Sequence, residues 1–331
     1  MSTERTLEGK TVLVTGGAGF IGSHFVRWLL RRHARTRVID LDKLTYAGDL
    51  ENLGEARDDP RHEFVAGDIR DKALVRSLAA RVQGIVHFAA ETHVDRSIHD
   101  AGEFVLTNVH GTYTLLDAAR ACPHLEFFVH ISSDEVYGSR PVRAARESDP
   151  LAPSSPYAAS KAAGDHLARA YHVTYGLPAI VLRPSNTYGP NQYPEKLMPR
   201  FLTHALEGRP LPVFGDGLNV REWLHVDDHC LAVEAAILRG RAGAVYNVGG
   251  GVERTNLDVA RHLLDAVGAS RDLVQFVPDR PGHDRRYAME SGLIRALGWE
   301  PKVPFAEGLE RTARWYAANR SWWRRLKTRP L

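Results

Sequence analysis

Short apolar segments alternate with longer segments of helical apolar spacing through the first half of the chain. Thr11–Thr15 is a β-branched apolar run, and Ser23–Leu30 repeats apolar residues at the spacing of one helix face. This alternation predicts an α/β fold built on a doubly wound parallel sheet. Further strands are expected at 37–41, 63–68, 84–90, 126–131 and 179–183, with helices at 71–80, 102–121 and 155–175.

A glycine-rich turn joins the first strand to the first helix. Gly16, Gly19 and Gly22 occupy the glycine positions of a G-x-x-G-x-x-G motif. Such glycines permit a tight turn and let backbone N–H groups at the helix N-terminus approach a pyrophosphate. The sequence therefore predicts a dinucleotide-binding domain of the Rossmann type.

Acidic residues at the end of the second strand indicate which dinucleotide is bound. Asp42, and as an alternative Asp40, would accept a hydrogen bond from the adenosine ribose and repel a 2′-phosphate. This favours NAD over NADP, although Lys43 and Arg37 are close enough in sequence to tolerate the phosphate. Asp68 ends the third strand, where it could reach the adenine or cap the next helix.

The pattern changes after Arg183, where prolines at 184, 190, 194, 199, 210 and 212 divide the chain into short segments. We therefore predict that residues 1–183 form the NAD-binding domain and that 184–331 form mainly a smaller C-terminal substrate-binding lobe. Ala244–Val248 has the pattern of a strand, and we expect it to return to the first domain near residues 243–250.

Composition sets few further limits. The formal net charge of +3 comes from nearly balanced charges, which does not indicate nucleic-acid binding. Cys122 and Cys230 are too few for a disulfide framework, so we expect a reducing, cytoplasmic location. Met1–Lys10 is charged without an apolar signal core, and no apolar run approaches the roughly 20 residues of a membrane span. We expect no contact with a membrane.

Two other clusters receive ordinary structural interpretations. The tail Arg320–Leu331 combines arginines with tryptophans, and we predict a helix end whose tryptophans pack inward. His225 and His229 have the spacing of a metal site, but the sequence offers no evident third ligand. We therefore predict no metal and expect Asp227 or Asp228 to cap the following helix.

The candidate chemistry lies after the fifth expected strand. Asp134 and Glu135 follow Ser133 directly, and Tyr157 lies four residues before Lys161, on the same face of one helix. An ammonium about 4 Å away contributes roughly 4 kcal/mol toward lowering the phenol pKa. An acid beside a carboxylate exceeds what a bare hydride transfer needs and indicates that a carbon–oxygen bond is also broken. The predicted reaction is therefore a dehydration.

These motifs together resemble a known family. Thr-Gly-Gly-Ala-Gly-Phe-Ile-Gly at 15–22, with Ser133 and Tyr157-x-x-x-Lys161, is similar to the extended short-chain dehydrogenase/reductases, the NAD-dependent epimerase/dehydratase family, over nearly the whole chain. The segments at 42–48, 93–97, 133–138, 194–197 and 279–287 resemble the members of that family that dehydrate dTDP-glucose.

The resemblance implies a reaction cycle and a set of binding residues. Tyr157 would take the O4 proton while the C4 hydride passes to NAD. Glu135 would then remove the C5 proton while Asp134 protonates the departing C6 hydroxyl, and the hydride would return to C6. NAD would be bound by Gly16, Gly19, Phe20, Ile21, Gly22, Asp42, Lys43, Thr45, Asp68, Ile69, Ala89, Ala90, Thr107, Tyr157 and Lys161. The nucleotide-sugar would contact Thr92, Ser133, Asn186, Lys196, Leu197, Pro212, Phe214, Arg221, Asn256, Arg280 and His283.

The resemblance also implies a homodimer formed by the helices near 102–121 and 155–175. The chain departs from the usual pattern at Ser133, where threonine is common, and at Thr187, where a second asparagine is usual. The nucleotide, dTDP or UDP, and the downstream pathway stay open. The alternatives are another nucleotide-sugar 4,6-dehydratase, a 4-epimerase, a uronate decarboxylase or a non-catalytic NAD-binding sensor.

Overall fold

The computed structural model describes residues 5–329, so residues 1–4 and 330–331 of the terminal segments considered above lie outside the described part. The strands are β1 (Thr11–Thr15), β2 (Arg37–Asp42), β3 (His62–Ala66), β4 (Gly84–His87), β5 (Phe127–Ile131), β6 (Ala179–Pro184), β7 (Asn186–Tyr188), β8 (Leu211–Phe214), β9 (Val220–His225), β10 (Val245–Val248), β11 (Val252–Thr255) and β12 (Val274–Val277). The α-helices are α1 (Phe20–Arg32), α2 (Lys72–Ala79), α3 (Val94–His99), α4 (Gly102–Phe104), α5 (Thr112–Arg120), α6 (Pro156–Tyr175), α7 (Leu197–Ala205), α8 (Val226–Arg239), α9 (Asn256–Val267), α10 (Gly292–Arg295), α11 (Phe305–Ala318) and α12 (Arg320–Lys327). The other helical segments are η1 (Leu50–Asp58), η2 (Val105–Gly111), η3 (Asp134–Tyr137) and η4 (Arg271–Leu273), of which η2 is a π-helix and the rest are 3₁₀.

A seven-stranded sheet in the order β10-β6-β5-β4-β1-β2-β3 forms the centre of the molecule. Every neighbouring pair of its strands is parallel. The apolar residues of the inner strands are buried on both faces, as a parallel sheet requires, and the edge strand β3 is only partly buried. The predicted doubly wound α/β fold is confirmed.

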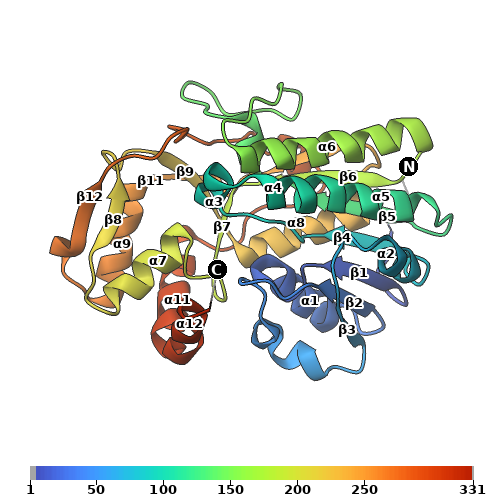
Figure 1. Cartoon of the computed structure of the whole chain (residues 1–331), viewed down its shortest axis with the longest axis horizontal. Helices are drawn as coiled ribbons and strands as arrows, with labels where there is room; N and C mark the ends of the chain where they lie inside the picture. The colour runs from blue at the N-terminus through green and yellow to red at the C-terminus, as the bar shows by residue number, and fades with distance from the viewer. Residues whose placement is uncertain (1–4, 330–331) are drawn as a thin grey trace.

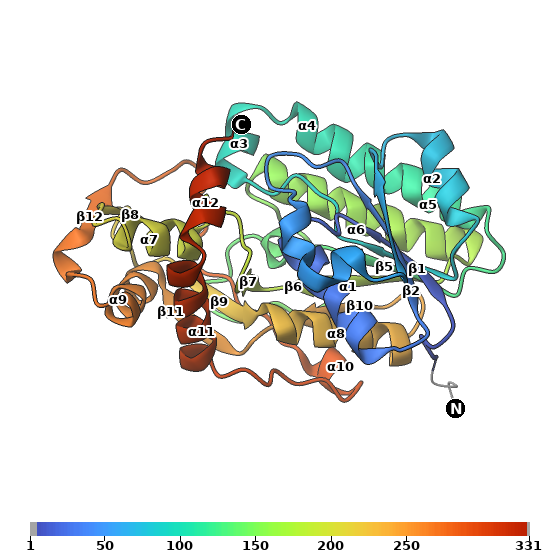
Figure 2. The ribbon, with the colours of Figure 1, turned by 90° about the horizontal axis from the view of Figure 1, so that it is seen from below.

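Helices cover both faces of the sheet (Figures 1 and 2). Helices α1 and α8 pack together on one face, where Phe25, Leu29 and Val233 join the core. Helices α2, α5 and α6 pack on the other face, where Val75, Leu115 and Ala168 do the same. The helix expected at 102–121 is interrupted, because the π-helix η2 separates α4 from α5.

A smaller lobe lies at one end of the sheet, on the left in Figure 1. It contains the strands β7, β9 and β11 in one sheet, the pair β8 and β12, and the helices α7, α9, α11 and α12. Trp322 and Trp323 of α12 are buried in its core, so the prediction that these tryptophans pack inward is confirmed. Strand β10 returns to pair with β6, and α8 covers the main sheet.

The start of α8 differs from the expectation for Asp227 and Asp228. His225 is the N-cap, and its Nδ1 accepts a hydrogen bond from the backbone N–H of Asp227 at 3.2 Å. Asp228 instead accepts hydrogen bonds from the N–H groups of Lys302 and Val303. The predicted aspartate cap was therefore wrong, because a tertiary contact with the 302–303 segment takes the carboxylate that would have capped the helix.

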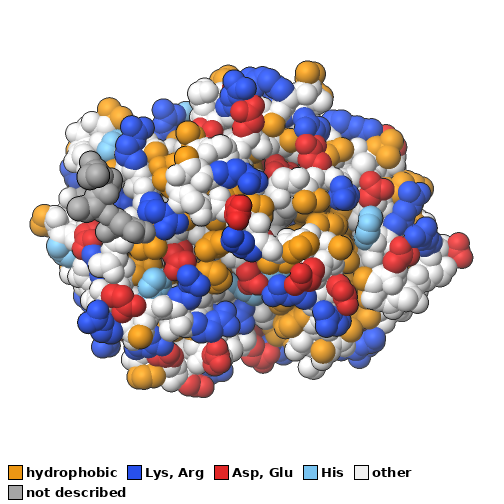
Figure 3. Space-filling model, turned by 180° about the vertical axis from the view of Figure 1, so that it is seen from behind, with side chains coloured by type: hydrophobic (Ala, Val, Ile, Leu, Met, Phe, Trp, Pro, Cys, Tyr) orange, Lys and Arg blue, Asp and Glu red, His pale blue; other side chains and the backbone are white. Residues whose placement is uncertain are grey.

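Charges of both signs are interspersed over the surface, as the face in Figure 3 shows. This fits the nearly balanced composition behind the net charge of +3. Within residues 5–329, none of the helices combines the length and apolar character needed to cross a bilayer.

The turn between β1 and α1 brings two backbone segments close together. Gly16 has a φ of +74°, and a Cβ there would lie 2.7 Å from the backbone N of Ala89, which follows β4. A Cβ on Gly22 would lie 2.1 Å from the carbonyl oxygen of Gly16. Both positions therefore exclude any side chain, which is why glycine stands at each.

We predict that Gly16→Ala destabilises the protein far more than Gly9→Ala. Gly9 has nearly the same φ, +76°, but a Cβ there meets no atom of the described chain within 4 Å. Gly9→Ala should therefore cost only the left-handed strain of about 1–2 kcal/mol. Gly16→Ala should cost about 1–3 kcal/mol more, because the β1 turn and the segment after β4 must separate. Urea unfolding followed by tryptophan fluorescence measures both, and equal losses would contradict the close approach.

Candidate active site

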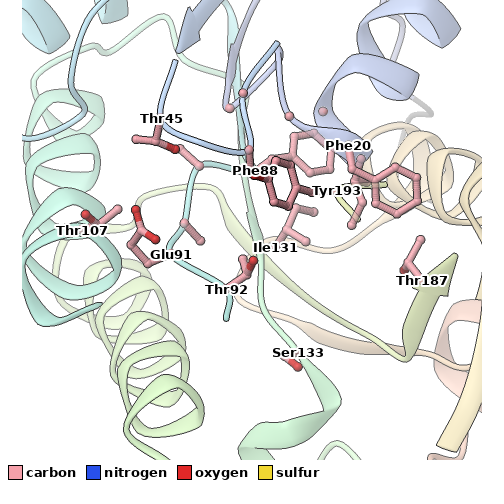
Figure 4. A pocket seen from close by; sticks show the side chains of 18 of the residues that line it. Phe20, Thr45, Phe88, Glu91, Thr92, Thr107, Ile131, Ser133, Thr187 and Tyr193 are labelled. Atoms are coloured by element: carbon pink, nitrogen blue, oxygen red, sulfur yellow. The ribbon is translucent and has the colours of Figure 1, made fainter. Parts of the chain in front are cut away.

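Two adjoining cavities lie at the carboxyl edge of the main sheet. The first is lined by the segments that follow β1, β2, β3, β4, β5 and β6, and lies where the strand order reverses between β1 and β4. Every residue expected to bind NAD lines it. In Figure 4, Thr107 and Glu91 lie together on one wall and Thr187 lies on the opposite wall.

The glycine turn of this cavity fits a pyrophosphate. Helix α1 begins at Phe20 after the N-cap Gly19, and no described side chain caps it or places a carboxylate in its first turn. Its first N–H groups are therefore open to an anion. Gly19 itself lines the cavity, so a side chain there would occupy the space that a ligand needs. The residues present fit a bound dinucleotide.

Of the two acidic residues at the end of β2, only Asp42 lines the cavity. Its carboxylate accepts hydrogen bonds from the N–H groups of Ala18, at 3.0 Å, and Leu44, at 2.7 Å. Burial raises the pKa of Asp42 to about 6. Asp40 is fully buried, packs against Gly17 and faces His62, so the alternative that Asp40 contacts the ribose was wrong. Side chains two positions apart on a strand lie on the same face. Asp40 and Asp42 therefore share a face of β2, and they differ in how far along the strand they lie from the cavity.

The basic residues near Asp42 are not free for a 2′-phosphate. Lys43 Nζ lies 3.0 Å from Asp68 Oδ2 on the cavity wall. Arg37 begins β2 and therefore lies at the opposite edge of the sheet from the cavity. Burial acts to raise the pKa of Asp68, but hydrogen bonds from Arg70 and Lys43 outweigh it and hold that pKa at about 2. Asp71, not Asp68, caps α2.

The turn η3 carries the expected acid and base. Ser133 is its N-cap, with Oγ accepting from the N–H of Glu135 and donating to Asp134 Oδ1, both at 3.2 Å. Burial, then the charges of Glu135 and Glu222, raises the pKa of Asp134 well above its ordinary value. Burial also raises the pKa of Glu135, but Arg221, Arg280 and Lys196 act to lower it. Asp134 is thus held as the acid, and Glu135 is the more readily ionised of the two.

Helix α6 brings Tyr157 and Lys161 to the same cavity as Ser133. Burial raises the pKa of Tyr157 above its ordinary value, the nearby carboxylates add to this, and a hydrogen bond with Ser133 opposes it. In the chain without nucleotide, the predicted lowering of the phenol pKa by Lys161 does not outweigh burial and the nearby carboxylates. Lys161 Nζ donates to the carbonyl oxygen of Ile131 at 2.6 Å, and burial lowers the pKa of Lys161 to about 8. The free chain keeps Tyr157 protonated.

The second cavity lies between the main domain and the smaller lobe. Of the expected nucleotide-sugar residues, Thr92 and Ser133 line the first cavity, and Asn186 and Lys196 line both. The remaining ones, all on the wall of the second cavity, are Leu197, Pro212, Phe214, Arg221, Asn256, Arg280 and His283. Glu135 also lines both cavities, so the candidate base stands where they meet.

Arg221 has the surroundings of an anion-binding residue. Its guanidinium lies 4.2 Å from the ring centroid of Tyr287, and Nη1 donates to the carbonyl oxygen of Val220 at 2.8 Å. Nη2 is buried and has no hydrogen-bond partner among the described residues. A buried donor without a protein partner is what a diphosphate site requires of its arginine.

Sequence reasoning missed several residues that the tertiary structure brings to the cavities. Glu195 lines both, and its carboxylate accepts from Tyr46 at 2.8 Å and from Arg96 at 3.1 Å. Glu91 lines the first cavity, and Asn108 in the π-helix η2 holds its backbone from behind by hydrogen bonds at 2.8 and 2.9 Å without lining the cavity itself. These partners are far apart in sequence and leave no local pattern. The π-helical turn η2, a feature that often marks functional sites, is visible only in the structure.

His229 and Thr187 are hydrogen-bond partners of each other. Thr187 Oγ1 lies 2.9 Å from His229 Nδ1 and lines the first cavity. Burial lowers the pKa of His229 to about 3, so its imidazole is neutral. Within residues 5–329, no cluster of three or more histidine, cysteine or acidic side chains is arranged to hold a metal ion.

The chain is similar over nearly its whole length to known proteins. Over 322 residues, the chain is 54% identical to a dTDP-glucose 4,6-dehydratase of Streptomyces niveus, covering 96% of each sequence. It is similar to the crystal structure of the dTDP-glucose 4,6-dehydratase DesIV of Streptomyces venezuelae with NAD bound, with a TM-score of 0.93, 54% identity, and coverage of 96% of this chain and 99% of that one. It also resembles a UDP-glucose 4-epimerase of Thermotoga maritima, with a TM-score of 0.86, 30% identity, and coverage of 93% and 99% respectively.

The sequence model for GDP-mannose 4,6 dehydratase matches residues 13–312, which includes the glycine turn, the acid–base turn and the helix of Tyr157 and Lys161. The chain belongs to this dehydratase family, within the extended short-chain dehydrogenase/reductases.

Proposed function

We propose that this chain is an NAD-dependent dTDP-glucose 4,6-dehydratase, which makes dTDP-4-keto-6-deoxyglucose for deoxysugar biosynthesis. The observation that carries the proposal is the pair Asp134 and Glu135, whose pKa values are separated by their surroundings, beside Tyr157 at the junction of the two cavities. Sequence identity of 54% to dehydratases with this activity supports it.

NAD, which the glycine turn and Asp42 would hold in the first cavity, would supply a positive charge and a reversible hydride acceptor. That positive charge and the ammonium of Lys161 would lower the pKa of Tyr157, so that it loses its proton and can then accept the proton of the C4 hydroxyl. Glu135 removes the C5 proton, which the 4-keto group has made acidic. Asp134 donates its proton to the C6 hydroxyl, which leaves as water, and Glu135 returns its proton to C5 when the hydride reaches C6. The two carboxyl groups thus need opposite protonation states at one pH.

We assign NAD to the first cavity and the nucleotide-sugar to the second. Residues 1–183, with the returning strand near 243–250, would form the NAD-binding domain, and 184–331 would form mainly the sugar-nucleotide lobe. Arg221 and Lys196 are the proposed partners of the diphosphate, because they are cationic, lie on the wall of the second cavity and face Glu135.

A second copy of this chain is the proposed protein partner. Helices α5 and α6 pack side by side, and exposed apolar side chains lie at both ends of the pair, at Val105 and Leu106 and at Val173 and Tyr175. A two-fold dimer would cover these side chains. Cys122 and Cys230 are buried and unpaired, which suits the reducing cytoplasm in which we propose that the protein works.

The first prediction concerns the substrate and the acid–base pair. Incubation with dTDP-glucose should give a product lighter by one water in mass spectrometry. Glu135→Gln and Asp134→Asn should each lower kcat by about 10²–10⁴, the usual contribution of one general acid or base.

Other substrates separate the alternatives. A mass change with UDP-glucose or UDP-glucuronate alone would keep the fold and overturn the substrate. Epimerisation without loss of water would identify a 4-epimerase, and binding of NAD without any turnover would identify a sensor.

The second prediction concerns Asp42 and pH. Burial raises the pKa of Asp42 to about 6. The ionised carboxylate, which would accept a hydrogen bond from the ribose hydroxyl, therefore forms only as pH rises through that value. NAD affinity should therefore increase between about pH 5 and pH 7, and NADP affinity should increase less. Asp42→Asn should make NAD affinity less dependent on pH and should reduce the ratio of NAD affinity to NADP affinity. Isothermal titration calorimetry at constant ionic strength measures this, and a wild-type profile in the variant would remove Asp42 from the ribose site.

The third prediction concerns assembly. Leu106→Glu places a charge on the exposed apolar surface of the helix pair and should shift the protein from dimer to monomer. Leu218→Glu is the matched control, because Leu218 is also half-exposed, at 45% against 46%, but belongs to the smaller lobe. Analytical ultracentrifugation measures both variants. A wild type that sediments as a monomer would overturn the dimer.

A further inference from the structure

A fully buried ion pair lies beneath the catalytic helix. Asp165, on α6, accepts a hydrogen bond through Oδ2 from Arg183 Nε, on β6, at 2.7 Å. Their side chains are 0% and 1% exposed. Asp165 follows Lys161 by one helical turn, and its charge acts to raise the pKa of Lys161 against the effect of burial. The pair is therefore attached to the helix that carries both Tyr157 and Lys161.

The hydrogen bonds continue from Arg183 to the acid–base turn. Arg183 Nη1 donates to the hydroxyl of Tyr137 at 2.6 Å, and its guanidinium lies 4.8 Å from the centroid of that ring. The Tyr137 hydroxyl donates in turn to Asn247 Oδ1, on β10, at 2.7 Å. Tyr137 is the last residue of η3, the turn that carries Asp134 and Glu135. One chain of contacts thus joins α6, β6, η3 and β10.

The turn η3 needs an anchor of this kind. It has only four residues, it begins at Ser133 and it ends at Gly138, whose φ of +67° reverses the chain. A single 3₁₀ turn has few backbone hydrogen bonds of its own to hold it in place. Val136 packs against apolar neighbours, but such contacts tolerate sliding, whereas the Tyr137 hydroxyl is held from two directions.

Stability alone does not account for a buried ion pair, since replacing both charges by apolar groups is often neutral or stabilising. Geometry does account for it, because a displacement of about 1 Å at a reacting group can cost roughly 10²-fold in rate. Elimination requires Glu135 at the C5 proton and Asp134 at the C6 oxygen, on a sugar whose C4 is held at Tyr157. The turn and the helix must therefore stay in register.

We propose that Tyr137, Arg183 and Asp165 are positioning residues for the elimination step, which hold the turn of Asp134 and Glu135 in register with the helix of Tyr157 and Lys161. The proposal rests on the dehydratase function given above. Oxidation at C4 depends on Tyr157 and on α6, so it survives when the turn shifts. Removal of the C5 proton and departure of the C6 hydroxyl depend on the turn and are slowed.

The experiment separates these two steps in Tyr137→Phe, which removes one hydroxyl and keeps the ring. In a single turnover with dTDP-glucose, absorbance at the wavelength of reduced nicotinamide reports C4 oxidation, and loss of water by mass spectrometry reports elimination. Elimination should slow by about 10–100-fold while C4 oxidation changes by less than about 3-fold, so reduced cofactor accumulates. Substrate deuterated at C5 should show a larger isotope effect on turnover in the variant than in wild type.

A matched control and a second variant complete the test. Tyr188→Phe also removes one buried hydroxyl, which donates to the carbonyl oxygen of Phe305 at 3.3 Å in the smaller lobe. It should keep the wild-type ratio of the two steps. The double variant Asp165→Leu with Arg183→Met removes both charges together and should also slow elimination more than oxidation, although oxidation should be slower than in Tyr137→Phe because Lys161 loses the charge of Asp165. This variant decides the matter if Tyr137→Phe fails to fold.

Two outcomes would overturn the proposal. Equal slowing of oxidation and elimination would mean that the hydroxyl serves only stability, and a wild-type ratio in both variants would mean that the turn is held without this chain. A wild type that does not dehydrate dTDP-glucose would instead refute the proposed function, so the two failures are distinguishable.

Discussion

The active site depends on one constraint, that every strand of the central sheet runs in the same direction. All carboxyl ends then meet at one edge, and the segments that follow the strands face one another. The glycine turn follows β1, Asp42 ends β2, Ala89 and Ala90 follow β4, and Ser133 follows β5. Residues more than 100 positions apart along the chain therefore line one cavity. The close approach at Gly16 and Gly22 is the local condition for this, because it allows α1 to begin directly at the cavity.

Enclosure of this edge shifts the pKa values of the groups that we propose as catalytic. Burial alone raises the pKa of Asp134, Glu135 and Tyr157 in the same direction. Different charges face the two carboxyl groups: Arg221 acts on both, but Glu222 raises the pKa of Asp134, whereas Arg280 and Lys196 act to lower that of Glu135. Those cations come from the smaller lobe, so the chemistry on the main sheet is adjusted by residues of the other half of the chain.

The two halves are connected at several levels. Strand β10 follows the first elements of the smaller lobe in sequence and completes the main sheet. Asn247 on that strand accepts a hydrogen bond from the hydroxyl of Tyr137. Glu195 joins the loop of Tyr46, after β2, to the segment that lines both cavities. The cavities are thus closed by contacts between elements that sequence order keeps apart. These contacts hold the second cavity and the turn η3 in a fixed position relative to each other.

The sequence by itself determined what local pattern can encode. Alternating apolar segments predicted the parallel sheet, the glycine spacing predicted the turn at β1, and neighbouring or four-residue spacings placed Asp134 beside Glu135 and Tyr157 beside Lys161. Only the tertiary structure decided matters of burial and long-range pairing. Asp40 packs against Gly17 and faces His62. The carboxylate of Asp228 accepts hydrogen bonds from the 302–303 segment, and burial raises the pKa of Tyr157. The reason is physical: a carboxylate or a phenol has the same local sequence whether it faces water or the interior, and its protonation depends on the surrounding solvent and charges.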